Sequence, residues 1–299
     1  MKGAFEVGKK WSFIASVQEE KLSPEIIEQA LRFLEPWSRV FPKEDSWSQQ
    51  NFNVPSLIVR LDCIAKGGQL LIYEVEERPA GIGIATQLNL SFTENLSRIR
   101  AQWPQFKSLV SPLRNSCDDF FWLKSISMES AVSNGALLLI RAEPEEEDFH
   151  PLVGRSVSSL IVKGDKSYGT SLGLWREVSE EDFDFLPWDR GFCLKPIKGS
   201  KCRGIEIWLP KEEKKRVEAG GVSTKTRIKR VLENYGKMYL QDFIEPMRSS
   251  IDKSLFMAYR IFFGYSPSGN SYKYLGGLWN ARPNLKIHGA TDTIVGPVA

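Results

Sequence analysis

The sequence predicts an α+β fold, in which β-hairpins and helices are mixed along the chain. One observation is a helix signature at Ser23-Pro24-Glu25, where a serine N-cap precedes proline at the first helical position and an acid in the first turn. Two others are the β-hairpin patterns at 55–75 and 256–279. The sequence has no repeat of fixed period and no regular strand–helix alternation, which disfavours an alternating α/β barrel.

Each hairpin pattern is a pair of apolar segments joined by turn residues. In the first, the turn Lys66-Gly67-Gly68 separates segments 55–59 and 69–75. In the second, a loop with Pro267 and Gly269 separates segments 256–265 and 272–279. Further strands are expected at 136–140, 158–162, 191–194, 204–209 and 238–244, and further helices at 170–177 and 225–237.

The composition is that of a soluble globular protein. Hydrophobic residues make up 42% of the 299 residues and charged residues 26%, which excludes a mostly disordered chain, a collagen-like repeat and a disulfide-dense scaffold. The net charge of +3 gives no reason to expect a polyanion-binding surface. We therefore predict no nucleic-acid partner and interpret the basic segment 225–237 as a solvated helix face. Two histidines are too few for a zinc site built on imidazoles.

Cysteine usage and hydropathy favour a cytoplasmic location. None of the four cysteines stands in a CxxC pair, so free thiols in a reducing compartment are expected. Residues 1–17 lack the continuous apolar region of a signal peptide. The longest apolar runs are too short to span a bilayer, and no membrane partner is predicted.

An acidic segment, 143–148, is the best place to divide the chain, because a charge run of this kind is typical of an exposed connector. We expect an N-terminal helical segment on the substrate side at 1–55. The region 56–150 then carries a carboxylate cluster, and 151–299 carries a basic loop and an apolar strand end.

The carboxylate cluster belongs to the first hairpin. Alternation places Arg60 and Asp62 on one sheet face, and likewise Glu74 and Glu76, and the hairpin brings the two pairs together. Several like charges held so close need a cation, and Mg²⁺ prefers a few carboxylate oxygens together with waters and phosphates. The alternative is a salt-bridged hairpin on a solvated sheet face.

The basic loop lies between two strand patterns. Lys195 ends an apolar strand just before Pro196, and Lys198, Gly199 and Ser200 follow in the loop. Backbone N–H groups of such a loop can wrap an anion, and its lysines add charge. The spacing is not that of a P-loop. The alternative is a hairpin with a basic tip.

Two later segments have the character of a binding-site wall. Gln241, Asp242, Phe243 and Ile244 form an apolar strand end that could offer adenine a slot with backbone donors and acceptors. The alternative is an edge strand that leaves the sheet. The stretch 276–292 combines small residues, a tryptophan and polar groups, which suggests a site-lining loop.

Together these motifs resemble the ATP-grasp enzymes. Asp62, Glu74-Val75-Glu76 and Pro79 resemble the family's magnesium-binding end, which carries an acid and then Glu-x-Asn before a proline. Lys166 resembles the family's earlier nucleotide-contacting lysine. Leu194-Lys195-Pro196 resembles the phosphate-binding strand, and Gly199, Ser200 and Gly204 resemble the flexible glycine loop. The segment 241–246 resembles the hinge strand that holds adenine.

The order of these motifs is circularly permuted relative to the usual family order, because the carboxylates come first. Glutathionylspermidine synthase-like ligases share this order and the arginine two residues before the metal aspartate, as in Arg60-Leu61-Asp62. The resemblance spans roughly 60–79 and 163–282, about half of the chain. Glu76 departs from it, since the family usually has asparagine there.

The resemblance implies a circularly permuted ATP-grasp ligase that joins a small-molecule or peptide carboxylate to an amine through an acyl phosphate, with ATP and Mg²⁺. Asp62, Glu74 and Glu76 would hold Mg²⁺, and Lys166 and Lys195 would grip the phosphates. The loop 198–204 would close over them and Arg60 would stabilise the transferring group. Either Arg260 or Arg282 would reach the γ-phosphate, and spacing does not choose between them. The alternatives are a ligation-deficient nucleotide-binding protein and a small-molecule kinase.

Overall fold

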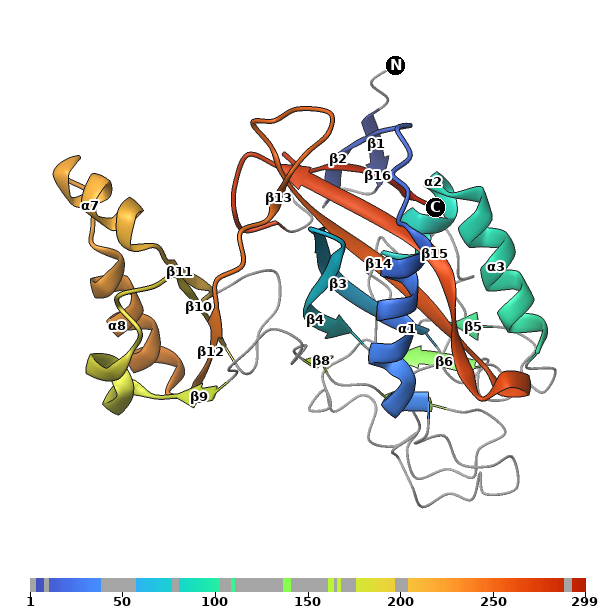
Figure 1. Ribbon diagram of the computed structural model, residues 1–299, viewed down its shortest axis with the longest axis horizontal. Coiled ribbons are helices and arrows are strands. Elements are labelled where there is room, and N and C mark those ends of the chain that lie inside the picture. Colours follow the sequence, from blue (N-terminus) through green and yellow to red (C-terminus); the bar gives the residue numbers. More distant parts are fainter. Residues whose placement is uncertain are drawn as a thin grey trace.

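The computed structural model describes residues 4–7, 11–38, 58–76, 81–102, 109–110, 137–140, 161–163, 166–167, 176–196, 204–287 and 292–299. These residues form the mixed α+β fold that the sequence predicts, with sheets and flanking helices. Two parts stand apart in Figure 1: a large lobe built on a long antiparallel hairpin, and a small lobe joined to it through the segment after β12 (Met238–Asp242).

The large lobe is built on a sheet of nine described strands in the order β1-β2-β16-β15-β14-β3-β4-β8, with β13 paired to β14. Its strands are β1 Ala4–Val7, β2 Trp11–Ala15, β3 Ile58–Lys66, β4 Gln69–Glu76, β8 Lys166–Ser167, β13 Met247–Arg248, β14 Phe256–Ser266, β15 Ser271–Arg282 and β16 Ile294–Val298. Both predicted hairpins, β3–β4 and β14–β15, are confirmed. The turn of the first places Gly67 and Gly68 at positive φ, which only glycine adopts readily.

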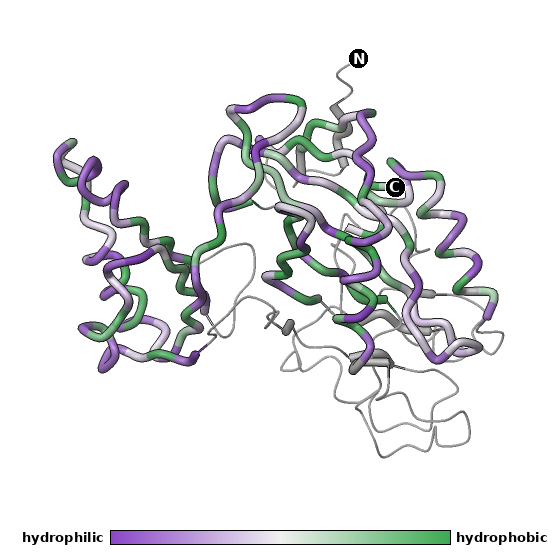
Figure 2. The backbone as a smooth tube through the Cα atoms, viewed as in Figure 1, coloured by the Kyte–Doolittle hydropathy of each residue, from purple (hydrophilic) through white to green (hydrophobic). Residues whose placement is uncertain are grey.

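Three of the described helices pack on this sheet. Helix α1 (Pro24–Ser38) begins where the sequence predicts and buries Ile26, Ala30 and Leu34 in the large-lobe core. Helices α2 (Ile82–Leu88) and α3 (Leu90–Ala101) were not expected. In Figure 2 hydrophilic and hydrophobic residues alternate along α3, as expected for a helix with one face on the core.

The small lobe is a four-stranded antiparallel sheet in the order β11-β10-β12-β9. Its further elements are β9 Arg176–Val178, η3 Glu180–Phe185, β10 Phe192–Pro196, β11 Glu206–Trp208, α7 Pro210–Glu218 and α8 Thr224–Tyr235. Alternate strand residues, Phe192, Leu194, Met238 and Leu240, pack against α8 in a separate hydrophobic core. The predicted helix at 170–177 is wrong at its end, since Arg176 and Glu177 pair with β12 as a strand.

A third, parallel sheet consists of β5 Leu109–Val110, β6 Leu137–Ile140 and β7 Ile161–Lys163. A short turn of helix, η4 (Pro267–Gly269), closes the β14–β15 hairpin. The acidic segment 143–148 lies outside the described residues, so the division of the chain there stays a prediction. No helix in the described ranges has both the length and the apolar character needed to cross a membrane.

Candidate functional site

A cavity of about 180 Å³ lies between the two lobes, more than ten times the roughly 10–15 Å³ that one water requires. Sheet residues of the large lobe form one wall: Arg60, Asp62, Tyr73, Glu74, Ala258 and Arg260. Residues of the small lobe form the other: Cys193, Lys195, Ile207, Gln241, Asp242 and Phe243. The loop 285–287 after β15 also borders the cavity.

Strand alternation explains why polar side chains face the cavity from the large lobe while the residues next to them in sequence lie in the hydrophobic core. On β3, Arg60 and Asp62 face the cavity, whereas Leu61 and Cys63 between and after them belong to the hydrophobic core. Burial raises the pKa of the Cys63 thiol well above its ordinary value, and the nearby Asp62 charge adds to the shift. Cys63 is therefore a protonated core residue.

Strand β4 reaches the cavity through a β-bulge. Asp62 is the register partner of Glu74 and Cys63 is the partner of Ile72, so Tyr73 is an extra residue on β4. The bulge places Ile72 in the core while both Tyr73 and Glu74 border the cavity. Burial raises the pKa of the Tyr73 phenol well above its ordinary value, and the charge of Asp62 acts in the same direction. Tyr73 therefore stays protonated at neutral pH.

Asp62 is held by two arginines. Arg60 Nε donates to Asp62 Oδ1 at 2.6 Å and Arg60 Nη2 donates to Oδ2 at 3.1 Å, and Arg60 is only 1% exposed. Arg260 Nε lies 3.6 Å from Asp62 Oδ2. In the amide orientation that its neighbours require, Asn280 also accepts from Arg260 Nε at 3.1 Å. The result is a buried, hydrogen-bonded ion cluster on the cavity floor.

The small-lobe wall follows the same alternation. Cys193 and Lys195 are register partners of Gln241 and Tyr239, and they lie on the face of the sheet that turns away from α8. Gln241 is 2% exposed, and its Nε2 has no hydrogen-bond partner among the described residues. A buried amide donor without a partner is costly. Since Gln241 borders the cavity, a ligand acceptor is the group that could satisfy it.

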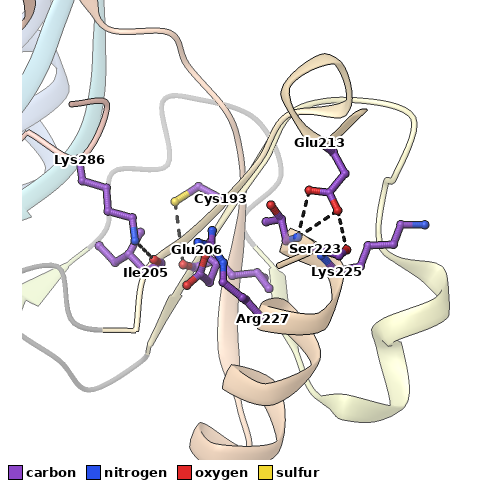
Figure 3. A network of polar contacts seen from close by, with 10 residues as sticks. Cys193, Ile205, Glu206, Glu213, Ser223, Lys225, Arg227 and Lys286 are labelled. Atoms are coloured by element: carbon purple, nitrogen blue, oxygen red, sulfur yellow. Dashed lines mark hydrogen bonds and ion pairs between the residues drawn. The ribbon is translucent and has the colours of Figure 1, made fainter. Parts of the chain in front are cut away.

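Two lysines cross from one lobe to the other in reciprocal directions. Lys195 of the small lobe donates from Nζ to the Tyr73 carbonyl oxygen of the large lobe at 3.4 Å, and its ammonium lies 5.4 Å from the centre of the Tyr73 ring. Lys286 of the large lobe donates from Nζ to the Ile205 carbonyl oxygen of the small lobe, as Figure 3 shows. Both lysines border the cavity, so cations approach it from both sides.

The carboxylates on the large-lobe wall suit a hard cation. Asp62 and Glu74 are neighbours on adjacent strands and both face the cavity. Mg²⁺ takes one or two carboxylates and completes its shell with water and phosphate oxygens, so the donor type and number fit. Among the described residues no group of three His, Cys, Asp or Glu side chains could enclose a metal by themselves.

Comparisons with known proteins name no family. No family model matches the chain, and no curated protein matches it. Among solved structures, a glutathione synthetase-like effector from Globodera pallida has a TM-score of 0.38 at 9% identity, over 95% of this chain and 89% of that chain. A protein of Methylobacillus flagellatus KT, provisionally assigned as a gamma-glutamylcysteine synthetase, has a TM-score of 0.40 at 12% identity, over 90% and 82%. At TM-scores this low, neither likeness carries weight for function.

The structure gathers most of the candidate residues around this cavity. They are Arg60, Asp62, Glu74, Lys195, Gln241, Asp242, Phe243, Ile244 and Arg260. Glu76 and Lys166 are register partners on β4 and β8, but their side chains are not described. Lys198, Gly199 and Ser200 lie outside the described residues.

Of the candidates whose side chains the structure describes, Arg282 is the one that does not border the cavity. Its Nη1 donates to the Lys286 carbonyl oxygen at 2.9 Å and its Nη2 donates to Asp292 Oδ2 at 2.8 Å. Of the two arginines that spacing could not separate, Arg260 is therefore the one at the cavity.

Two polar residues that border the cavity, Tyr73 and Lys286, were not individually predicted from the sequence. Tyr73 reaches the cavity only because of the bulge, for which the sequence carries no signal. Lys286 does lie in the stretch 276–292, which was expected to line a site, and residues 285–287 of that stretch border the cavity.

Proposed function

We propose that the chain is an ATP-dependent carboxylate–amine ligase of the circularly permuted ATP-grasp type. One observation carries the proposal: a single cavity has Asp62 and Glu74 on one wall and Lys195 and Gln241 on the other. A magnesium nucleotide needs this combination of acids for the metal, a cation for the phosphates and a buried donor for the base.

The small-lobe wall would hold the nucleotide. Gln241 Nε2 is the buried donor that an acceptor atom of the base would satisfy, and the strand end 242–244 would provide an apolar slot. The Phe243 N–H is already engaged with the Gly191 carbonyl oxygen at 3.1 Å, which holds this segment against β10. Lys195 lies on the same face of the sheet and would bind a phosphate.

The large-lobe wall would manage charge on the transferred group. Asp62 and Glu74, with Glu76 as a third expected carboxylate, would hold Mg²⁺, and when bound this ion supplies the positive charge that neutralises phosphate oxygens. Arg260 and Arg60 would stabilise the negative charge that develops during transfer. Enclosure between the lobes would exclude water from the acyl phosphate.

The proposed reaction has two steps. A carboxylate oxygen of the substrate forms a bond to the γ-phosphorus of ATP while the bond from that phosphorus to the β–γ bridging oxygen breaks, which gives acyl phosphate and ADP. The amine nitrogen then forms a bond to the acyl carbon and loses a proton, while the carbon–oxygen bond to phosphate breaks. The products are an amide, ADP and inorganic phosphate.

The test is ADP release screened over carboxylate and amine libraries, with mass spectrometry of the products. For any active pair, the carboxylate is labelled with ¹⁸O, and we expect one label in the released phosphate together with an amide. A stable phosphorylated product would indicate a kinase instead. Failure of the chain to bind ATP would overturn the proposal.

A second candidate is a nucleotide-binding protein that does not ligate. It is favoured by the commitment of both Asp62 oxygens to Arg60, since a metal at Asp62 would have to share them. ATP binding without ADP release in any acceptor mixture would support this candidate.

A further inference from the structure

We propose that Lys286 binds an anionic group of the cavity ligand, a polyphosphate, from the large-lobe side. The proposal rests on the proposed function for the identity of the ligand, but its physical basis is the loop 283–287 itself. Lys286 borders the cavity opposite Lys195, so the two ammonium groups come from opposite lobes. The sequence pattern marks Lys286 only as part of the stretch 276–292 and assigns it no ligand.

The loop holds Lys286 in place from its backbone. The Lys286 N–H donates to Asn284 Oδ1 at 2.9 Å, and the Lys286 carbonyl oxygen accepts from Arg282 Nη1 at 2.9 Å. Arg282 is itself buried and is fixed by Asp292 at 2.8 Å. The base of the side chain is therefore positioned before any ligand arrives, which lowers the entropy lost on binding.

The charge of Lys286 lacks an acidic partner within the described part of the chain. No carboxylate there lies within ion-pair distance of its Nζ, and the Ile205 carbonyl oxygen that it contacts carries no net charge (Figure 3). An ammonium has three donors, so this contact leaves donors for a ligand. Lys286 is half-buried, so its charge is partly removed from water and an anionic ligand group would compensate it.

The remaining charges of the cavity point the same way. Asp62 is bound by Arg60 and Arg260, and Asp242 pairs with Arg190 at 3.3 Å. Among the described residues that border the cavity, the cations Arg60, Lys195, Arg260 and Lys286 outnumber the acids Asp62, Glu74 and Asp242. A ligand with several negative charges complements this arrangement better than a neutral one.

The test measures binding of inorganic tripolyphosphate, adenosine and ATP by calorimetry to the full chain and three variants. Lys286→Met removes both the charge and the contact with Ile205, whereas Lys286→Gln removes the charge and keeps a donor for the Ile205 carbonyl. Lys229→Met, on the exposed face of α8, is the matched control. Far-UV circular dichroism and the unfolding midpoint check that each variant folds.

We expect both Lys286 variants to weaken tripolyphosphate binding by about 10- to 100-fold, the usual effect of losing a hydrogen bond to a charged group. Adenosine affinity should stay unchanged, and Lys229→Met should bind like the wild type. Wild-type affinity in Lys286→Gln would mean that Lys286 only ties the lobes together, and would overturn the inference. So would the absence of tripolyphosphate binding to the wild type.

The two proposals fail in different ways. One outcome is that tripolyphosphate binding depends on Lys286 while adenosine does not bind and ATP binds no more tightly than tripolyphosphate. This outcome would overturn the proposed ligase and leave the anion site standing. ATP-dependent ligation with unchanged nucleotide affinity in both Lys286 variants would do the reverse.

Discussion

Asp62 and Glu74 are directly opposed on neighbouring strands because the chain of β4 contains one extra residue, Tyr73, before Glu74. Without this bulge, Ile72 and Glu74 would share a sheet face, and one of them would be on the wrong side. With it, Ile72 is 2% exposed in the core while Glu74 borders the cavity. The pairing of the two carboxylates is thus a product of local backbone irregularity.

Replacing Glu74 with glutamine tests the carboxylate pair. We expect Glu74→Gln to lower ATP turnover by about 10² to 10³, the typical effect of removing one charge-stabilising group. The free energy of unfolding should change little, because the amide has the same shape. The measurement is steady-state ADP release, with Glu233→Gln on the exposed face of α8 as control. Unchanged turnover would contradict the metal assignment.

Removing Arg60 should destabilise the large lobe. Arg60→Met leaves the buried Asp62 carboxylate without its two closest donors, which typically costs about 3–5 kcal/mol. Urea unfolding measures the loss, and the double variant Arg60→Met/Asp62→Leu should recover most of it. Arg32→Met, in an exposed ion pair with Glu28, should leave stability nearly unchanged. Equal losses in the single and double variants would show that packing, and not the unpaired charge, is responsible.

Gln241 should separate binding from stability. In Gln241→Leu the buried Nε2 donor that has no partner among the described residues disappears, so the free energy of unfolding should rise by about 1 kcal/mol while ATP affinity falls by about tenfold. Gln29 is the matched control, because its amide does have partners. It donates to the Gly68 carbonyl oxygen and accepts from the Leu70 N–H, both at 2.9 Å. Gln29→Leu should therefore lower stability and leave ATP affinity unchanged. A loss of stability in Gln241→Leu would assign the residue a purely structural role.

The carboxylate of Glu213 on α7 should make the small lobe acid-sensitive. Burial acts to raise its pKa, but hydrogen bonds from Ser223 and Thr224 at the start of α8 outweigh burial and lower the pKa below its ordinary value of 4.5. A lowered folded-state pKa contributes stability that is present above pH 4.5 and is lost as the pH falls through the folded-state value.

Unfolding free energies at pH 7 and pH 3 check this expectation. Between pH 7 and pH 3 the unfolding free energy of the wild type should fall by up to about 1 kcal/mol more than that of Glu213→Gln. The difference is small because solvent screens a charge at a partly exposed helix N-terminus. Glu212→Gln, which removes an exposed partner of Lys215, should behave like the wild type. An identical pH dependence in Glu213→Gln and wild type would contradict the stabilising role of the Glu213 carboxylate.

Sequence patterns that span a few residues correctly predicted the turns and helix starts that depend on neighbouring residues. The turn at Gly67 and Gly68 and the helix start at Ser23-Pro24 depend on residues adjacent in sequence, and the elements at both follow the prediction. Helix α2 begins after Gly81, which has a φ of 92° and no side chain that could cap the helix. The start of α2 is therefore not marked by a capping residue in the sequence. Arg176 and Glu177 have no local preference for a strand and become one by pairing with β12.

The sequence by itself determined the α+β class, the hairpins and the residue types that a nucleotide site would need, because turn chemistry, capping and alternation act over a few residues. Only the tertiary structure decided which of those residues meet. The bulge at Tyr73, the approach of Lys195 and Lys286 from opposite lobes, and the separation of Arg260 from Arg282 depend on contacts between residues far apart in the chain. Such contacts are fixed by the packing of whole sheets and helices, and no local pattern encodes them.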